Sequence, residues 1–227
     1  MKRGWFITGT DTGVGKTLVA TGLLNSFARL DDRAIGMKPV ASGCQATPAG
    51  LRHDDAVALL NASSVQAEYP EVNPYAFAPA VAPHLAAQAA GVEISLEKIH
   101  ACFTRLCALA DTVVVEGIGG WCVPLGRDIT TVDLALSLSL PVILVVGMRL
   151  GCLNHALLTV ESIQHSGLKP AGWVANQIDP VMERLQENIA ALQQRIPAPL
   201  LGAIPFNKAK SFGAQSDYLN IPLLLGT

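Results

Sequence analysis

A glycine-rich segment joining a short apolar run to a helical pattern constrains the fold of this chain more than any other feature. The segment reads FITGTDTGVGKT, Phe6–Thr17, and the helical pattern follows over Leu18–Leu30. Backbone N–H groups of such a turn, together with the positive end of the next helix, form a nest for phosphate oxygens. We therefore expect Lys16 to reach the outer phosphates of a nucleotide and the Thr17 hydroxyl to bind magnesium.

The segment departs from the strict phosphate-loop pattern G-x-x-x-x-G-K-[ST]. Counting back from Gly15 places Thr10, not Gly9, at the first glycine position. A Gly-Lys-Thr that occurs by chance in a surface turn is the alternative. The strand pattern before the segment and the helix pattern after it favour a variant nucleotide-binding loop.

Short apolar runs recur along the chain and predict buried strands. They are rich in β-branched residues and do not alternate with polar ones, as expected of strands covered on both faces. The runs are WFIT near Gly4, Thr112–Glu116, Pro141–Gly147, Ala171–Asn176 and Leu200–Ile204.

Helical patterns lie between these runs. Apolar residues at three-and-four spacing predict one helix from Leu96 to Ala110. A second is expected to start with Asp179 as its cap and Pro180 in its first turn, and to continue as far as Ile196. The three prolines within Asn73–His84 indicate a long loop.

The alternation of strand and helix predicts an α/β fold of the P-loop NTPase type. Its central sheet is expected to be mostly parallel, with helices on both faces and ligands at the carboxyl ends of the strands. With 227 residues and no low-complexity linker, the chain is expected to form a single domain over residues 1–227.

Charge, cysteine spacing and the length of apolar runs indicate which kinds of partner and compartment to expect. A formal net charge of −2 and the absence of a Lys/Arg-rich run argue against a nucleic-acid partner. The five cysteines lack a C-x-x-C pair or a Cys/His ligand spacing, so we expect them to be reduced. The start MKRGWFITG lacks a secretory signal, and no apolar run reaches the roughly 20 residues that a bilayer needs, which indicates a cytoplasmic protein without a membrane partner.

Two acidic residues are candidate magnesium ligands. Glu116 ends the run TVVVEG, where a carboxylate at the carboxyl end of a strand would face the loop; a solvated strand end is the alternative. Asp55 lies in RHDDAVALL, and its spacing alone equally fits a helix cap formed by Asp54 or Asp55.

Lys38, in GMKPVASGC, is expected to be a second lysine at the phosphate site. The proline that follows favours extended backbone at Lys38, which would place it at the end of a strand beginning near Ala34. If that strand neighbours the phosphate loop, Lys38 and Lys16 converge on one anionic centre, as phosphoryl transfer to a second anion requires. A snorkelling lysine at the sheet edge is the alternative.

Several motifs, taken in order, resemble those of the dethiobiotin synthetase family. They are GWFITGTDTGVGKT, KPVASG, GLRHDDA, VNPYAF, VEGIGGW, PVILVVGMRLGCLNHALLT, GWVAN and PAPLLGAIP, and they extend from the first strand pattern to Pro205. The resemblance implies a cyclo-ligase of biotin biosynthesis that converts 7,8-diaminononanoate, CO2 and MgATP to dethiobiotin. It also implies a carbamate intermediate and a carbamic-phosphoric mixed anhydride.

The resemblance also implies roles for residues at matching positions. Lys38, Lys16 and Thr12 fall on catalytic positions, and Thr17, Asp55 and Glu116 on magnesium ligands. Nucleotide-binding positions fall on Gly13, Val14, Gly15, Lys16, Thr17, Leu18, Asp55, Glu116, Gly117, Ile118, Gly119, Asn176, Gln177 and Pro205, with Asn176 reading the adenine. Ser42 falls on a residue that contacts the diamine.

Family members are homodimers, and this implies a substrate site shared between two subunits. GCLNH, from Gly151, resembles the segment that receives the substrate carboxylate from the partner subunit. The N–H groups of Cys152 and Leu153 and the Asn154 amide suit that role, because a helix start offers donors to an anion. A cap alone is the other interpretation of Asn154.

The chain departs from the family pattern at three places. Gly13 replaces an acidic residue, Gln177 replaces an aspartate, and the tail after Pro205 has no evident match to the acidic residue that contacts ribose. An inactive or re-targeted paralogue is therefore one alternative function. A positioning-type P-loop ATPase switch is another, although Thr10, Asp11 and Thr12 occupy the place of that class's second lysine.

Overall fold

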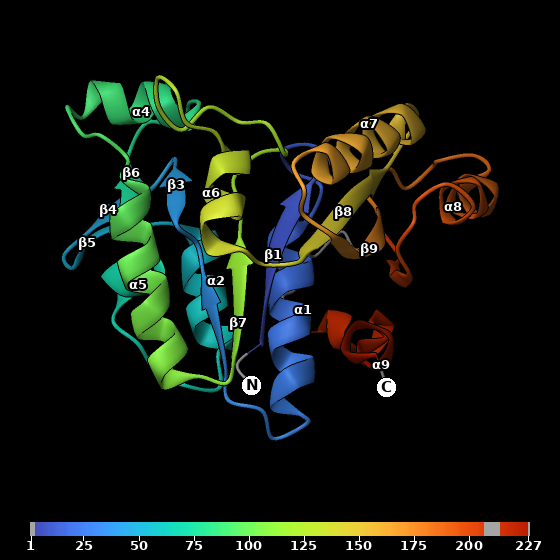
Figure 1. Ribbon diagram of the computed structural model, residues 1–227, viewed down its shortest axis with the longest axis horizontal. Helices are drawn as coiled ribbons and strands as arrows, with labels where there is room; N and C mark the ends of the chain where they lie inside the picture. Colours follow the sequence, from blue (N-terminus) through green and yellow to red (C-terminus); the bar gives the residue numbers. More distant parts are fainter. Residues whose placement is uncertain (1–2, 207–213, 227) are drawn as a thin grey trace.

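The computed structural model describes residues 3–206 and 214–226. Within these residues, the main sheet has six strands in the order β10-β9-β8-β1-β7-β2, and all of its pairings are parallel (Figure 1). The strands are β1 (Arg3–Gly9), β2 (Ala34–Met37), β7 (Thr112–Glu116), β8 (Val142–Met148), β9 (Pro170–Gln177) and β10 (Leu200–Ile204). The strands predicted from the apolar runs and from Ala34 are confirmed.

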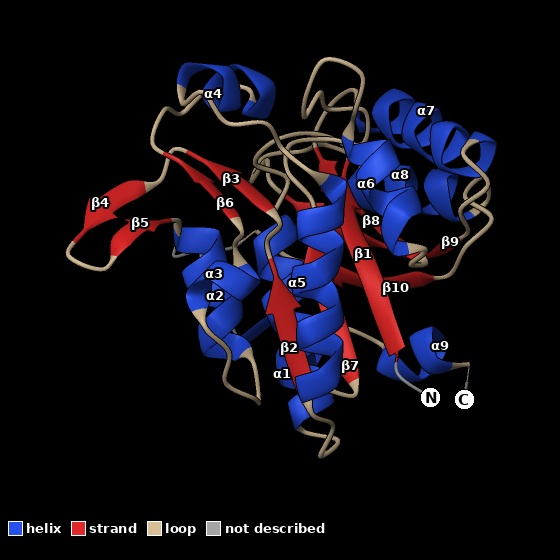
Figure 2. Cartoon of the chain, turned by 60° about the vertical axis from the view of Figure 1, so that its left-hand side comes forward, coloured by secondary structure: helices blue, strands red, loops and turns tan. Residues whose placement is uncertain are grey.

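Alternate residues of the buried strands pack into cores on opposite faces of the sheet. In β1, Phe6 lies in a cluster with side chains of α5 (Leu96–Leu109) and α6 (Thr131–Leu138), whereas Ile7 lies with those of α1 (Lys16–Ala28). Helices therefore cover both faces (Figure 2). The remaining elements are α2 (Asp54–Ala62), α3 (Tyr69–Val72), α4 (Pro83–Ala89), α7 (Cys152–His165), α8 (Leu185–Gln193), α9 (Ile221–Leu225), the 3-10 helix η1 (Ala214–Tyr218), and the short strands β3 (Val40–Ser42), β4 (Gln45–Thr47), β5 (Gly50–Arg52) and β6 (Tyr75–Phe77).

The helix pattern predicted from Leu96 is confirmed as α5. The hydroxyl of Ser95 caps it by accepting a hydrogen bond from the Lys98 N–H over 3.2 Å. Ile99 and Leu106 on its apolar stripe are fully buried against the sheet. Local periodicity and burial agree for this helix.

The second helix prediction was wrong about where the helix begins. Asp179 and Pro180 form a turn, in which the Asp179 carboxylate accepts a hydrogen bond from the Val181 N–H over 3.0 Å. Arg184 has a φ of 56°, outside helical geometry, so α8 starts only at the next residue. The helix ends at Gln193, and Ile196 is buried beyond it.

The loop predicted over Asn73–His84 was also wrong in part. Tyr75–Phe77 forms β6, which pairs in parallel with β3 in a separate two-stranded sheet. Pro83 then occupies the first turn of α4, where a missing N–H costs nothing. Asn73 and Pro74, before β6, and the stretch between β6 and α4 are irregular.

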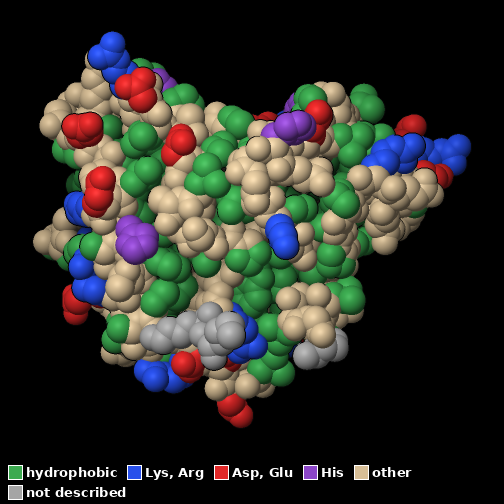
Figure 3. Space-filling view, viewed as in Figure 1, with side chains coloured by type: hydrophobic (Ala, Val, Ile, Leu, Met, Phe, Trp, Pro, Cys, Tyr) green, Lys and Arg blue, Asp and Glu red, His purple; other side chains and the backbone are tan. Residues whose placement is uncertain are grey.

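On the face drawn in Figure 3, lysine and arginine side chains are scattered and do not form one stripe. All five cysteines are free. Among the described residues, no helix combines the length and apolarity needed to cross a membrane.

Candidate functional site

The turn between β1 and α1 has the geometry of a phosphate site. Gly13 and Gly15 have φ values of 77° and 95°, which glycine adopts without strain. Gly15 is the N-cap of α1, and within the described chain no side chain caps this helix start. The first N–H groups of α1 therefore point toward a ligand space without an intrahelical partner.

Gly15 also lies against Asn176, the next-to-last residue of β9. The Asn176 side-chain amide donates a hydrogen bond to the Val14 carbonyl over 2.8 Å. This bond connects the phosphate turn to β9. A Cβ atom at Gly15 would lie 2.2 Å from Nδ2 of Asn176. At Gly13, by contrast, no described heavy atom outside its chain neighbours lies within 4 Å of such a Cβ.

Alanine at the two glycines is therefore expected to have unequal effects. We predict that Gly15→Ala lowers the free energy of unfolding by about 2–3 kcal/mol, because it combines backbone strain with displacement of the Asn176 hydrogen bond. It should also weaken nucleotide binding. Gly13→Ala is the matched control and should cost only about 1 kcal/mol. Urea denaturation and nucleotide titration measure both effects, and equal losses for the two variants would contradict the assigned role of Gly15.

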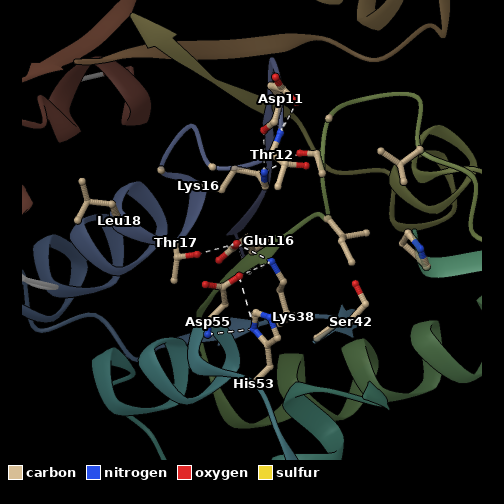
Figure 4. Close-up of a pocket in the computed structure, with 18 of the residues that line it drawn as sticks. Asp11, Thr12, Lys16, Thr17, Leu18, Lys38, Ser42, His53, Asp55 and Glu116 are labelled. Carbon is tan, nitrogen blue, oxygen red and sulfur yellow. Dashed lines mark hydrogen bonds and ion pairs between the residues drawn. The ribbon is translucent and has the colours of Figure 1, made fainter. Parts of the chain in front are cut away.

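Lys38 is buried at the centre of the site, with only 3% of its side chain exposed. Its ammonium donates to Glu116 Oε1 over 2.6 Å, to Asp55 Oδ2 over 3.0 Å and to the Gly117 carbonyl over 3.0 Å (Figure 4). Burial alone would lower the pKa of Lys38, but the carboxylates of Glu116 and Asp55 hold it above its usual value. Lys38 is therefore a fixed cation, and the snorkelling alternative does not hold.

Backbone hydrogen bonds fix the position of Lys38. The Lys38 N–H donates to the Val72 carbonyl over 2.8 Å, and the Lys38 carbonyl accepts from Asn73 Nδ2 over 2.7 Å. The strand β2 borders β7 and not β1, so the condition that this strand neighbours the strand of the phosphate loop is not met. Because β7 lies between them, Glu116 at its carboxyl end is the bridge between Lys38 and the loop.

Lys16 approaches the same centre from the phosphate turn. Its ammonium donates to the Gly119 carbonyl over 2.5 Å and to the Asp11 carbonyl over 3.1 Å. Burial, followed by the nearby charge of Lys38, lowers the pKa of Lys16 to about 8. An anion between the two lysines would favour the charged form of both.

Three oxygen-bearing side chains form the part of the site that suits a divalent cation. Thr17 donates its hydroxyl proton to Glu116 Oε1 over 2.9 Å, and Asp55 lies beside these two residues, where its Oδ2 accepts from the Lys38 ammonium over 3.0 Å (Figure 4). Burial raises the pKa of Glu116, while for Asp55 the opposing charge of Lys38 outweighs burial and lowers the pKa. Glu116 Oε2 is buried and has no hydrogen-bond partner. Such an oxygen fits a hard cation.

The number of these ligands is small. Within the described residues, no group of three or more His, Cys, Asp and Glu side chains could hold a metal ion by itself. Two carboxylates and a hydroxyl suit a cation that is shared with phosphate oxygens, because magnesium at nucleotide sites keeps only one or two carboxylate ligands.

These groups line a cavity of about 920 Å³, a size suited to a nucleotide and a second small molecule. The predicted residues that line it are Thr12, Gly13, Gly15, Lys16, Thr17, Leu18, Lys38, Ser42, Asp55, Glu116, Ile118, Gly119, Asn176 and Gln177. Val14 and Gly117 lie beside it in the chain, and Pro205 lines a smaller hollow that also includes Gln177.

The predicted carboxylate-binding segment is not at this cavity. Gly151 and Asn154 lie at the start of α7 and are not among the residues that line the cavity. The Cys152 N–H, expected to be free for substrate, donates to the Arg149 carbonyl over 3.0 Å. Within the chain, the turn before the helix thus uses this donor, and the role of the segment toward a partner's substrate stays a prediction.

His53 was missed by the sequence interpretation. It lines the cavity, and its Nδ1 accepts a hydrogen bond from the Asp55 N–H over 3.1 Å. His53 is thus the N-cap of α2, so neither Asp54 nor Asp55 caps this helix. The only feature of the sequence that could have indicated a site role for His53 is its position directly before Asp54 and Asp55.

The tail after Pro205, which has no evident match to the family's ribose-contacting acidic residue, falls within the described residues only at position 206 and over 214–226. In the described part of the tail, Asp217 forms an ion pair with Arg29 over 2.6 Å. Gln177 donates to the Asp179 carbonyl over 3.0 Å. Its amide therefore has a structural use where the family has an aspartate.

Comparison with known proteins gives close relatives over almost the whole chain. A family profile described as an AAA domain matches residues 3–211. The ATP-dependent dethiobiotin synthetase BioD of Xanthomonas euvesicatoria pv. vesicatoria is 50% identical over 218 residues, which are 96% of this chain and 97% of the relative. The protein of the same name from Pseudomonas aeruginosa strain UCBPP-PA14 is 51% identical over 224 residues, 98% of each chain.

Solved structures resemble the fold at low sequence identity. The septum site-determining protein MinD complexed with Mg-ADP from Pyrococcus horikoshii has a TM-score of 0.58 at 17% identity, covering 99% of this chain and 95% of that one. A ParA family ATPase from Chlorobium tepidum has a TM-score of 0.58 at 13% identity, covering 100% and 90%. The fold is that of the P-loop NTPases.

Proposed function

The chain belongs to the ATP-dependent dethiobiotin synthetase family, and we propose that it closes the cyclic urea of dethiobiotin from 7,8-diaminononanoate, CO2 and ATP. It is a ligase of biotin biosynthesis. The observation that carries the assignment of roles is the convergence of Lys38 and Lys16, from separate elements, on one cavity next to two acidic side chains.

The reaction brings two anions together. One amine of the substrate reacts with CO2 to give a carbamate. A carbamate oxygen then bonds to the γ-phosphorus as the bond from that phosphorus to the bridging oxygen breaks and ADP leaves. The second amine attacks the carbamoyl carbon, the bond from that carbon to the phosphate oxygen breaks, and phosphate departs. The two amines lose their protons along the way, which balances the reaction.

Lys38 and Lys16 have complementary parts in this sequence. We assign Lys38 to the carbamate and the transferring phosphoryl group, and Lys16 to the outer phosphates, where Thr12 of the same turn also faces the cavity. Fixed cations stabilise charge that spreads over both anions in the transition state without reorganisation. Ser42 lines the cavity beside this centre and suits the diamine end as a donor and acceptor.

Magnesium fits the donors present, and we assign it to Thr17, Asp55 and Glu116. When bound there, the ion would neutralise phosphate charge and orient the phosphoryl group. The unpartnered oxygen of Glu116 supports this assignment. Asn176 and Gln177, at the end of β9, are assigned to the base of the nucleotide together with Pro205.

We further propose a homodimer in which Gly151–Asn154 of one subunit completes the substrate site of the other. The segment lies off its own cavity, and Leu150 and Leu158 near it expose 94% and 57% of their surface. Exposed apolar residues of this kind favour a protein contact. Because its co-substrate ATP is abundant in the cytoplasm, we place the reaction there.

The direct test is phosphate release by the purified protein with diamine, bicarbonate and MgATP. We expect release to depend on both the diamine and bicarbonate. Hydrolysis of ATP at the same rate without diamine would instead indicate a switch ATPase, and no release with a bound nucleotide would indicate an inactive paralogue.

Adjacent aspartates test the magnesium assignment. Asp55→Asn should lower turnover roughly tenfold to a hundredfold and raise the magnesium concentration needed for half-maximal rate, because one hard ligand loses its charge. Asp54→Asn is the matched control, since Asp54 is exposed in the same helix turn and should leave turnover unchanged. A magnesium titration of both variants gives the comparison. An unchanged magnesium dependence in Asp55→Asn would remove that residue from the ligand set.

A further inference from the structure

Asp11 is an acidic side chain in the very turn that is assigned to an anion. It lines the cavity and exposes 47% of its side chain. A carboxylate beside a polyphosphate repels it, and this repulsion weakens binding unless a cation offsets the charge. Among the described residues, neither Lys16 nor Lys38 donates a hydrogen bond to this carboxylate.

Arg149 supplies that cation from another element. Its Nη2 lies 2.7 Å from Oδ2 of Asp11, while Oδ1 accepts a hydrogen bond from the Thr12 N–H over 2.7 Å. The carbonyl of Asp11 accepts from Lys16 over 3.1 Å. Asp11 thus links Arg149 to the loop lysine, and in Figure 4 it lies at the far end of the loop from Lys38.

The arginine is itself held in place. It follows β8 directly, and its carbonyl accepts the hydrogen bond from the Cys152 N–H that begins α7. The end of a buried strand and the start of a helix therefore fix its backbone on both sides. A guanidinium on such a rigid base can keep one orientation.

We propose that Arg149 is a positioning residue for the nucleotide: it neutralises and orients Asp11, so that the phosphate turn accepts a polyphosphate. The inference rests on the proposed function only in taking a nucleotide as the ligand of this turn. Stability does not account for the pair, because Arg149 and Asp11 expose 43% and 47% of their side chains, and exposed pairs contribute little to stability.

The test is binding of a non-hydrolysable ATP analogue with magnesium, measured by titration calorimetry without diamine. Arg149→Ala should raise the dissociation constant about threefold to tenfold, and more at low salt than at high salt. In turnover assays it should raise KM for ATP while kcat changes little. Arg149→Lys keeps the charge and should remain close to the unaltered protein.

A second substitution separates charge from structure. Adding Asp11→Asn to Arg149→Ala removes the repelling charge, and asparagine can still accept from the Thr12 N–H. This double variant should recover affinity to within about twofold of the unaltered protein. Arg105→Ala is the matched control, because Arg105 forms a similar exposed pair with Glu71 over 2.7 Å, away from the cavity lining, and should leave nucleotide affinity unchanged.

Three results would overturn the inference. They are unchanged affinity in Arg149→Ala, a loss in Arg149→Lys equal to that in Arg149→Ala, or a double variant as weak as Arg149→Ala. If the unaltered protein bound no nucleotide, the proposed function would fail as well. Normal binding that is insensitive to Arg149 would leave the proposed function intact and reject the inference alone.

Discussion

Replacing Lys38 by glutamine is expected to reduce diamine-dependent phosphate release by at least about a thousandfold, while nucleotide still binds. In the proposed reaction the ammonium contacts both the carbamate and the moving phosphoryl group, and fixed charges at such points are worth about a hundredfold to a thousandfold each. Phosphate release at saturating diamine measures turnover, and titration with an ATP analogue measures binding. Lys98→Gln is the control, because Lys98 contacts Tyr75 and the Pro74 carbonyl outside the cavity lining.

The same substitution should also destabilise the fold. Glu116 is 1% exposed, and removing Lys38 leaves this buried carboxylate without its ion-pair partner, a change that typically costs about 3–5 kcal/mol. The double variant Lys38→Gln with Glu116→Gln removes both charges and should regain most of this stability without regaining turnover. Turnover that returns with stability would show that Lys38 acts only through the fold.

Replacing Glu116 by glutamine is the second large effect that we expect. The Oε1 atom of glutamine can still accept from Lys38 and Thr17, as Glu116 Oε1 does over 2.6 and 2.9 Å. The shape of the site is therefore largely kept while its charge is lost. We expect turnover to fall by at least about a hundredfold, because the carboxylate is the most buried of the proposed magnesium ligands.

The magnesium dependence of nucleotide binding distinguishes this effect from general damage. Glu116→Gln should require at least about tenfold more magnesium, yet bind nucleotide without magnesium as well as the unaltered protein does. Glu71→Gln, at the exposed ion pair with Arg105, should leave both quantities unchanged. If Glu116→Gln weakened nucleotide binding equally with and without magnesium, the residue would not be a metal ligand.

Local sequence patterns predicted the elements that carry the site because each pattern had one structural solution. Continuous β-branched runs such as Thr112–Glu116 fit buried parallel strands, and the proline after Lys38 sets extended backbone at that residue. The phosphate turn was likewise recognisable from the strand, glycines and helix around Lys16. In each case the residues within one element were sufficient to predict its local structure.

What the patterns missed depends on contacts between distant elements. Strand order is not contained in the apolar runs, so β7 could not be placed between β1 and β2. The pair Asp179–Pro180 suits a turn as well as a helix start. The left-handed backbone of Arg184 interrupts any helix that would begin there, so Asp179–Pro180 forms a turn and α8 begins at Leu185. The pairing of Asp11 with Arg149 joins residues far apart in the chain, and no motif links them.

The most direct measurement follows oxygen from bicarbonate to phosphate. With 18O-labelled bicarbonate, the diamine and unlabelled ATP, mass spectrometry of the phosphate released at early times is predicted to find one 18O atom per phosphate. In the proposed reaction, the carbamate oxygen that bonds to the γ-phosphorus between Lys38 and Lys16 leaves with that phosphorus when the ring closes. Phosphate without 18O, whose fourth oxygen comes from the solvent, would mean that no carbamate attacks the nucleotide at this site.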